Sequence, residues 1–314
     1  METQIGCGAN QLFKRVGTFL RKCLFRVLSV GEIPNHIAFI LDGNRRYARK
    51  HNLAVEAGYR AGFVSLLSIL KYCSEMGVKH VTIFAFSVDN FKRRPHEVQC
   101  VMDLMLEKME VLLKEENVVK QYGVRICFIG SLKLLSEPIR IAAEKVTKAT
   151  AKNTRTVIFI CMAYSSGNEI THAVQHSCID KLENHSQARK HAKTHDDVNE
   201  CVEEHEKEGT TMVKLVDVEK HMCMRVAPDP DIIIRTSGEN RLSNFLLWQT
   251  DSCVLYAPPA LWPEIGLWHL VWAVINFQRY HSYLEKKRKQ LILPQEQFFT
   301  PTISSDCCKQ TLKR

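Results

Sequence analysis

Six short runs of the sequence are continuously apolar and rich in Val, Ile and Phe, and they constrain the fold more than any other feature. They occupy residues 36–41, 80–87, 124–130, 156–164, 231–236 and 253–257. Continuous apolarity is typical of strands that are buried on both faces of a parallel sheet. Segments with helical signals separate the runs, at residues 61–77, 95–123 and 137–153. This alternation predicts an α/β domain whose central, mostly parallel six-stranded sheet is flanked by helices.

The first 30 residues differ from the rest of the chain in their charge. Apolar side chains recur along one helical stripe at residues 11–30, and no acidic residue occurs between Glu2 and Glu32. Such a helix either packs on its own domain or lies flat on an anionic membrane surface, and a polar side with only positive charge favours the membrane. A transit peptide is a third alternative, but the stretch contains few serines. The basic residues that lie off the stripe are Lys14, Arg15, Arg21, Lys22 and Arg26.

The remaining chain has the composition of a globular protein, with 45% hydrophobic and 25% charged residues among 314. We expect one domain at residues 31–292 and a flexible tail at 293–314. Residues 176–221 interrupt the alternation with a polar stretch of mixed charge, which we interpret as a solvated insertion. Its histidines match no metal-ligand spacing. The 12 cysteines form no CxxC pair or spaced framework, which predicts reduced thiols.

A lone acid and a basic cluster directly follow the first predicted strand. Asp42 ends the apolar run, and Gly43, Asn44, Arg45 and Arg46 come next. Backbone N–H groups at a loop-to-helix junction favour an anion, and guanidinium groups form forked hydrogen bonds to phosphate oxygens. A carboxylate repels a bare phosphate but not one that carries Mg²⁺, which one or two carboxylates and substrate oxygens commonly hold. The stretch predicts either a Mg²⁺–diphosphate site with Asp42 as metal ligand, or a surface turn capped by Asp42.

Two further polar stretches follow the second and the fifth predicted strand, and open α/β sheets bind ligands beyond the carboxyl ends of their strands. The first stretch supplies donors and one apolar ring, from Ser87, Asn90, Phe91, Arg93 and Arg94. The second places arginines and serines around a glycine, at Arg235, Ser237, Gly238, Arg241 and Ser243. Each stretch is either an anion site or a solvated basic loop. Together with the net charge of +9, they favour a phosphorylated ligand.

A stripe of Met, Leu and Val side chains runs along the predicted helix at 95–123. Such a stripe either belongs to the core or lines a tunnel, where adaptable Met side chains suit a hydrocarbon. Two anion sites beside an apolar wall predict two phosphorylated substrates, at least one of which has a hydrocarbon tail.

Three motifs in these stretches together resemble the cis-prenyltransferases, the family of undecaprenyl and dehydrodolichyl diphosphate synthases. They are HIAFILDGNRRYARK at 36–50, FAFSVDNFKRRPHEV at 84–98, and DIIIRTSGENRLSNFLLWQ at 231–249 with LWPE at 261–264. The sequence is most similar to the rubber-type catalytic subunits of plants. The resemblance implies the undecaprenyl diphosphate synthase fold with its hydrophobic tunnel. It also implies elongation of an allylic diphosphate, such as farnesyl diphosphate, by isopentenyl diphosphate units to a long-chain, cis-linked dehydrodolichyl or rubber-type product.

The resemblance also implies residue roles. Asp42 would hold Mg²⁺ on the allylic diphosphate and help that diphosphate to leave. The residues that would cradle the allylic substrate are Gly43, Asn44, Arg45, Arg46, Tyr47, Phe91 and Arg93. Those that would bind isopentenyl diphosphate are Arg235, Arg241 and Ser243. Asn90, with Ser87, occupies the position implicated in proton removal, where an amide positions groups rather than acting as a simple base.

The chain departs from the family pattern at several positions. Val254 replaces the metal-binding Glu of homodimeric bacterial members, and residues 275–289 contain no Arg-x-Gly. These two losses are typical of eukaryotic catalytic subunits that work with a Nogo-B-receptor-like partner at the cytosolic face of the endoplasmic reticulum membrane. Tyr59 and Val55 stand where the family has His and Arg. The helix at 266–292 offers the partner Trp268, Leu270, Val271, Val274 and Phe277, and the alternative is that these residues close the domain core, as we expect for some of them.

Three alternatives compete with this interpretation. A haloacid-dehalogenase-like phosphohydrolase needs a second acid two residues after Asp42, where Asn44 stands. A weakly active or non-catalytic subunit of a prenyltransferase complex has no need to retain Asp42, Asn90, Arg235 and Arg241. Nucleic-acid binding is indicated by the net charge alone, so we expect no nucleic-acid partner.

Overall fold

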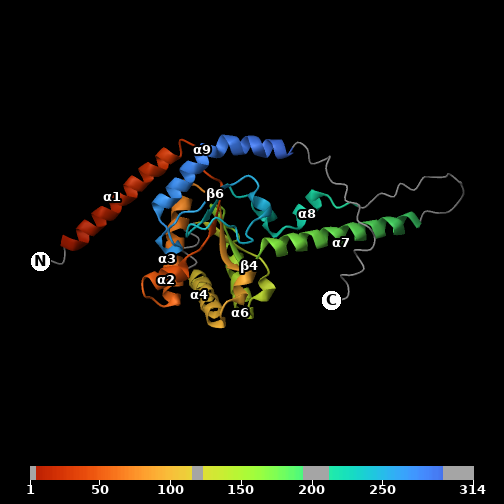
Figure 1. Cartoon of the computed structure of the whole chain (residues 1–314), viewed down its shortest axis with the longest axis horizontal. Coiled ribbons are helices and arrows are strands. Elements are labelled where there is room, and N and C mark those ends of the chain that lie inside the picture. Colours follow the sequence, from red (N-terminus) through yellow and green to blue (C-terminus); the bar gives the residue numbers. More distant parts are fainter. Residues whose placement is uncertain (1–4, 115–122, 194–211, 293–314) are drawn as a thin grey trace.

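The computed structural model describes residues 5–114, 123–193 and 212–292, and a six-stranded sheet forms its centre (Figure 1). All the strand pairs are parallel, and the spatial order is β3-β4-β2-β1-β5-β6. The prediction of a parallel α/β sheet is therefore confirmed. Each strand coincides with a predicted apolar run: β1 (His36–Ile40), β2 (His80–Ser87), β3 (Val124–Ile129), β4 (Thr156–Tyr164), β5 (Ile232–Arg235) and β6 (Val254–Tyr256).

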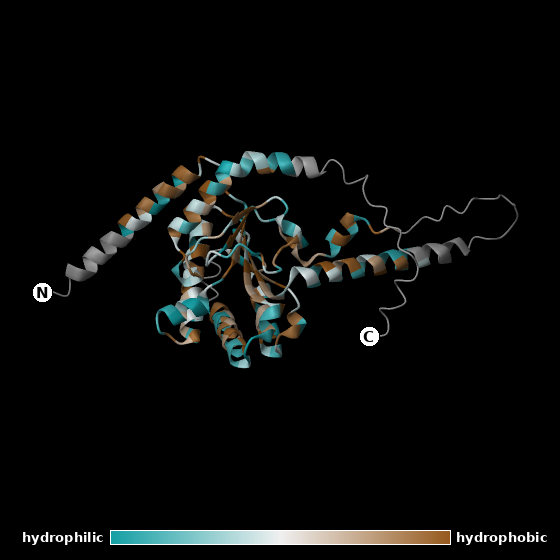
Figure 2. Ribbon diagram, viewed as in Figure 1, coloured by the Kyte–Doolittle hydropathy of each residue, from teal (hydrophilic) through white to brown (hydrophobic). Residues whose placement is uncertain are grey.

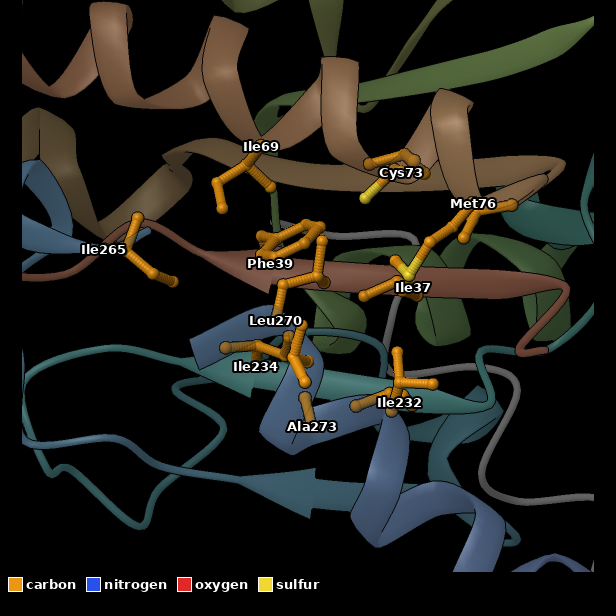
Figure 3. Close-up of a cluster of buried hydrophobic side chains, with 14 of the residues drawn as sticks. Ile37, Phe39, Ile69, Cys73, Met76, Ile232, Ile234, Ile265, Leu270 and Ala273 are labelled. Atoms are coloured by element: carbon orange, nitrogen blue, oxygen red, sulfur yellow. The ribbon is translucent and has the colours of Figure 1, made fainter. Parts of the chain in front are cut away.

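Helices cover both faces of the sheet, because both faces of its central strands are apolar. On one face, α3 (Val55–Met76) and α9 (Leu267–Ile292) pack on β1 and β5 (Figure 3). The residues that β1 and β5 contribute to this cluster are Ile37, Phe39, Ile232 and Ile234, and each is at most 1% exposed. A second cluster joins α4 (Pro95–Lys114) and α6 (Glu137–Thr150) to the strands β2, β3 and β4. These clusters hold the strand ends rigidly in place.

The strand register brings the predicted polar stretches to the same edge of the sheet. Ile40, the last residue of β1, is paired with Phe84 of β2 on one side and with Arg235 of β5 on the other. Asp42 and the stretch after β2 therefore come together with the stretch that begins at Arg235. The short helix α2 (Asn44–Lys50) starts at this edge, directly after Asp42.

The N-terminal helix α1 (Ile5–Leu28) packs on the domain through the end that is nearer to the sheet. Phe25 and Leu28 are each 6% exposed and belong to the cluster between α3 and α9. Arg21 forms an ion pair with Glu75 of α3 at 2.6 Å. No single helix among the described residues has the length and apolarity to cross a bilayer, and α2 with α3 meets that test only as a pair bent by 118°.

The predicted polar insertion begins inside a long helix. Residues 176–193 continue α7 (Ser166–Lys193), which projects from the body of the molecule, and the helix α8 (Leu215–His221) packs back on it (Figure 1). Within the described residues, no set of His, Cys, Asp or Glu side chains is arranged to hold a metal ion. Residues 194–211 of the insertion, residues 115–122 and the predicted tail at 293–314 lie outside the described residues.

The prediction for the partner-facing residues of α9 is wrong for four of the five. Their side chains are at most 4% exposed, because this face of α9 covers β5 and the edge strand β6. Trp268 is the exception at 71% exposed, and Trp272, one turn later, is 53% exposed. The four core residues are Leu270, Val271, Val274 and Phe277.

Candidate functional site

Asp42 lies at the centre of the polar edge, held by its own backbone. Its N–H is fixed by two hydrogen bonds, which it donates to Ile40 O at 2.9 Å and to Thr236 Oγ1 at 3.1 Å. Its carbonyl oxygen accepts from Thr236 Oγ1 and Ser237 Oγ in the β5 loop and from Trp262 N. The loops after β1 and β5 are thus joined directly beneath the carboxylate.

Two guanidinium groups from different parts of the chain bind the Asp42 carboxylate. Arg235 Nη2 donates to Oδ2 at 2.8 Å, and Arg46 Nη2 donates to Oδ1 at 3.1 Å. Burial opposes ionisation of this carboxyl group, but Arg235 and then Arg46 outweigh it, so the pKa of Asp42 lies below its usual value. The group is therefore an anion at neutral pH and is suited to a hard cation.

Arg235 connects Asp42 to the loop that follows β5. Its side chain is 9% exposed, and its Nη1 donates to Arg241 O at 2.5 Å and to Ser243 Oγ at 2.7 Å. Arg235 therefore orients the loop while its charge is held by Asp42. The Arg241 side chain, in contrast, is 64% exposed and free of the core, so it can turn toward a ligand.

The loop after β5 has an unusual backbone that a helix holds in place. Ser243, Asn244 and Leu246 all have positive φ, which side-chain-bearing residues rarely adopt. The start of α7 binds this loop: Ser166 N donates to Asn244 O at 2.8 Å and Gly167 N donates to Asn244 Oδ1 at 2.9 Å. Leu247 N in turn donates to Ser166 Oγ at 2.9 Å. The hold of α7 on this loop has no signature in the sequence, because nothing in residues 165–167 resembles a ligand site.

Glycines allow α2 and α3 to pack closely at the entrance of the site. Gly43 has φ 112°, and a Cβ there would lie 2.6 Å from Ser237 Oγ. Asn44 donates through Nδ2 to Leu41 O at 3.1 Å, while its Oδ1 occupies the space that a side chain at Gly62 would fill. Asn44 Oδ1 is buried and has no hydrogen-bond partner among the described residues. Asn44 therefore supports the turn after β1, and its unpaired Oδ1 faces α3 at Gly62.

Acidic residues pair with the predicted phosphate-binding arginines, and the sequence analysis missed two of these acids. Arg45 forms an ion pair with Glu97 of α4 at 3.0 Å. Glu239 lies between Arg46, at 3.6 Å, and Arg241, to which it is hydrogen-bonded. A single acid in a glycine-containing loop has no spacing signal, so only the fold reveals this bridge.

The stretch after β2 contributes Ser87, Asn90 and Arg93 to the site. Ser87 is 7% exposed and accepts from Asp89 N at 3.2 Å, which caps a single 3₁₀ turn at Val88–Lys92. Arg93 Nη1 donates to Tyr59 Oη at 3.4 Å, so the Tyr that replaces the family His lies within the site. Burial raises the pKa of Tyr59, which keeps its hydroxyl protonated as a donor.

A cavity of about 640 Å³ opens among these residues. Its polar lining includes most of the predicted site residues: Asp42, Asn44, Arg45, Ser87, Asn90, Arg93, Arg235, Arg241 and Ser243. Its apolar lining comes from the sheet, α3 and α4: Phe63, Leu66, Val101, Leu104, Met105, Met109, Leu112, Phe128 and Ile160. Met102 and Met109 also belong to the core, so the stripe of α4 serves both as core and as cavity wall.

Four predicted substrate-binding residues lie outside this lining. Tyr47 packs against His51 on α2, with ring centroids 4.4 Å apart. Phe91 is 37% exposed and contacts Phe86 edge to face, with centroids 4.9 Å apart. Gly43 and Arg46 are also absent from the lining, although both adjoin Asp42. Adjacent residues of α2 are rotated by about 100°, so Arg45 faces the cavity whereas Arg46 and Tyr47 do not.

Comparisons with known proteins agree with this geometry. Residues 40–284 match the prenyltransferase family model that is described as undecaprenyl diphosphate synthase. Dehydrodolichyl diphosphate synthase 6 of Arabidopsis thaliana is 56% identical over 91% of this chain and 97% of its own length. The rubber cis-polyprenyltransferase of Hevea brasiliensis is 51% identical over 89% of this chain and 96% of its own length.

More distant relatives extend the comparison to a complex and to a solved structure. A subunit of the dehydrodolichyl diphosphate synthase complex of Homo sapiens is 36% identical over 83% of this chain and 72% of its own length. The crystal structure of lavandulyl diphosphate synthase from Lavandula x intermedia, in complex with dimethylallyl diphosphate, superposes with a TM-score of 0.63 at 26% identity. That alignment covers 78% of this chain and 95% of the other.

Proposed function

The chain belongs to the undecaprenyl diphosphate synthase family and is a transferase for cis-prenyl chain elongation, and we propose that it joins the two diphosphate substrates across Asp42. The observation that carries this proposal is the position of the Asp42 carboxylate, which Arg46 and Arg235 bind from opposite sides. Arg46 belongs to α2, which follows β1, and Arg235 ends β5, so the carboxylate lies where two cationic sites meet.

The allylic diphosphate binds on the α2 side of Asp42. Arg45 and Arg93 line the cavity there, and α2 begins directly after Asp42 and Gly43. The ionised Asp42 would hold Mg²⁺ together with substrate oxygens, and the ion would supply positive charge against the diphosphate leaving group. Fixed guanidinium groups then stabilise the departing diphosphate without reorganisation of the site. Tyr59 accepts a hydrogen bond from Arg93, and its own hydroxyl proton is available to a substrate oxygen in place of the family His.

Isopentenyl diphosphate binds on the β5 side. Arg241 and Ser243 line the cavity on the loop that Arg235 and α7 hold. Asn90 lines the same cavity and, as a neutral amide, orients the substrate for proton loss rather than accepting the proton itself. The growing hydrocarbon lies along α4 and the sheet, where each buried CH₂ contributes about 0.8 kcal/mol.

We further propose that an accessory subunit of the Nogo-B-receptor type completes the site. Two observations support this: Val254 of β6 offers no carboxylate, and one relative is named as a subunit of a dehydrodolichyl diphosphate synthase complex. Trp268 and Trp272 are exposed on α9, the helix that packs on the edge strand β6, and they have the aromatic character of interface anchors.

The test of the proposed chemistry is the change Asp42→Asn, which keeps the shape of the side chain and removes its charge. We expect condensation of labelled isopentenyl diphosphate onto farnesyl diphosphate to fall at least about 100-fold, since one fixed charge at such a centre is lost. The control is Asp103→Asn, an exposed acid on the far side of α4 from the sheet, which should retain wild-type turnover. Substantial turnover of Asp42→Asn at saturating Mg²⁺ contradicts the assignment.

A further inference from the structure

Helix α1 meets the domain through only one of its faces. Phe25 and Leu28 are buried, Leu24 is partly buried, and Arg21 is held by Glu75 through bonds of 2.6 and 3.2 Å. The Arg21 guanidinium also lies 5.5 Å from the centre of the Tyr72 ring. Arg21 therefore serves the contact with the domain and is withdrawn from the charges that we expected to meet a membrane.

The apolar stripe of α1 lies on a second face, which the domain leaves uncovered. Phe19 is 64% exposed, Leu20 59%, Val27 69% and Val16 47%. At 3.6 residues per turn, the centre of this stripe is rotated by about 120° from the face that contacts the domain. Helix α1 runs along the outside of the molecule and extends away from it toward the N-terminus (Figure 1), and apolar residues recur in its part nearer to the domain (Figure 2).

The third face of α1 is basic. Arg15, Lys22 and Arg26 are exposed, and they border the apolar stripe on the side away from the domain. No acidic residue occurs between Glu2 and Glu32, and the one basic residue on the domain side is already paired with Glu75. The exposed part of the helix thus combines uncovered apolar side chains with unopposed positive charge.

This combination selects among the surfaces that could cover the stripe. A second copy of the same helix would bring like charges together, which disfavours self-association through this face. The surface of a bilayer that contains anionic lipids accepts both components, because apolar side chains enter the acyl boundary while Lys and Arg remain among the headgroups. We propose that α1 docks the catalytic domain on an anionic lipid surface through Val16, Phe19, Leu20, Cys23 and Val27.

The experiment measures co-flotation of the full-length chain with vesicles of phosphatidylcholine, with or without phosphatidylserine. We expect the wild type to float with the anionic vesicles and to remain free of the neutral ones. The double change Phe19→Glu with Leu20→Glu should abolish flotation. The double change Lys22→Glu with Arg26→Glu should weaken it by at least about 30-fold. Both pairs are exposed, so the melting temperature should stay at the wild-type value.

Matched controls place the same changes on other exposed helices. Val174→Glu with Leu182→Glu alters two exposed apolar residues of α7, and Lys145→Glu with Lys148→Glu alters two exposed basic residues of α6. Both controls should float like the wild type. Failure of the wild type to float with anionic vesicles overturns the proposal, as does flotation that survives the α1 changes. A dimer that becomes a monomer in Phe19→Glu with Leu20→Glu, without vesicle binding, would assign the stripe to a protein interface instead.

Discussion

Single side chains divide the site into two halves, and Arg241 and Arg45 represent these halves. Arg241→Ala should raise the KM for isopentenyl diphosphate by about 10- to 100-fold, the range expected for one charge-assisted contact, and should leave the KM for the allylic substrate nearly unchanged. Arg45→Ala should give the opposite pattern, because Arg45 lines the cavity beside α2. Steady-state kinetics with each substrate varied in turn measures both. Two variants that raise the same KM would show that the site is not divided in this way.

His36, at the other end of the sheet, controls stability rather than catalysis. It is fully buried, its Nδ1 donates to Pro228 O at 2.6 Å, and its Nε2 accepts from Thr82 Oγ1 at 2.7 Å. Burial lowers the pKa of His36 to about 4. The unfolded chain binds a proton near pH 6.5, so the stabilisation is complete above that pH. It declines by up to about 3 kcal/mol as the pH falls from 6.5 toward 4.

Urea unfolding at several pH values tests this expectation. The wild type should lose stability steadily between pH 6.5 and 4, and His36→Gln should lose less over the same range. His96→Gln, at an exposed histidine of α4, is the control and should follow the wild-type slope. Equal slopes for all three proteins would show that His36 does not govern the acid response.

Most polar residues of the site were predictable, because they follow the predicted strands. The carboxyl ends of parallel strands meet at one edge of the sheet. Asp42, Asn90, Arg235 and Ser243 all reach the cavity as expected. Tyr47 does not, since a short helix turns adjacent residues by about 100° and the sequence gives no phase for a helix of seven residues. Glu239 was not predictable because a single acid gives no spacing signal and its second partner, Arg46, is distant in sequence.

At the scale of elements, the start of α7 positions the loop to which we assign isopentenyl diphosphate. Asn244 carries this contact, with its backbone oxygen on Ser166 N and its Oδ1 on Gly167 N. Asn244→Gly keeps the left-handed backbone available but removes the Oδ1 contact. We expect the KM for isopentenyl diphosphate to rise about 3- to 10-fold, the value of one neutral hydrogen bond, with little change for the allylic substrate.

Two comparisons show whether Asn244 positions the loop or merely stabilises the fold. Asn244→Ala should add a stability loss of about 1 kcal/mol, because alanine disfavours a positive φ. A role in stability alone would lower the melting temperature of both variants while leaving the ratio of the two KM values at that of the wild type.

The strands were predictable as elements, and the packing of the helices was less so. Continuous apolar runs specify strands that are covered on both sides, and all six were found. The apolar residues of α9 carry no mark that separates core from interface. Leu270 and Val274 cover the sheet while Trp268 faces outward, and this follows from the direction of approach of the helix. The length of α7 within a polar segment was equally hidden, because charged residues sustain an exposed helix without an apolar stripe.

The whole molecule should depend on its partner for activity. We expect the purified chain to have almost no condensation activity alone. Its activity should rise strongly when it is mixed with an accessory subunit that carries a C-terminal Arg-x-Gly. Trp268→Ala with Trp272→Ala should prevent this gain by weakening the complex, because exposed aromatic anchors dominate such interfaces. Tyr280→Ala, on another face of α9, is the control and should be activated normally. Full activity of the homogeneous single chain would refute the requirement.

The acids that pair with the site arginines have a consequence for turnover. Asp42, Glu97 and Glu239 already occupy the guanidinium groups of Arg46, Arg235, Arg45 and Arg241. An arriving diphosphate therefore exchanges one anion for another instead of filling a bare cationic pocket. When inorganic pyrophosphate departs, the same carboxylates pair with the arginines again. They compete with the product for these guanidinium groups and thereby assist its release. The chain can thus hold two polyanions firmly during the reaction and still release the spent one quickly.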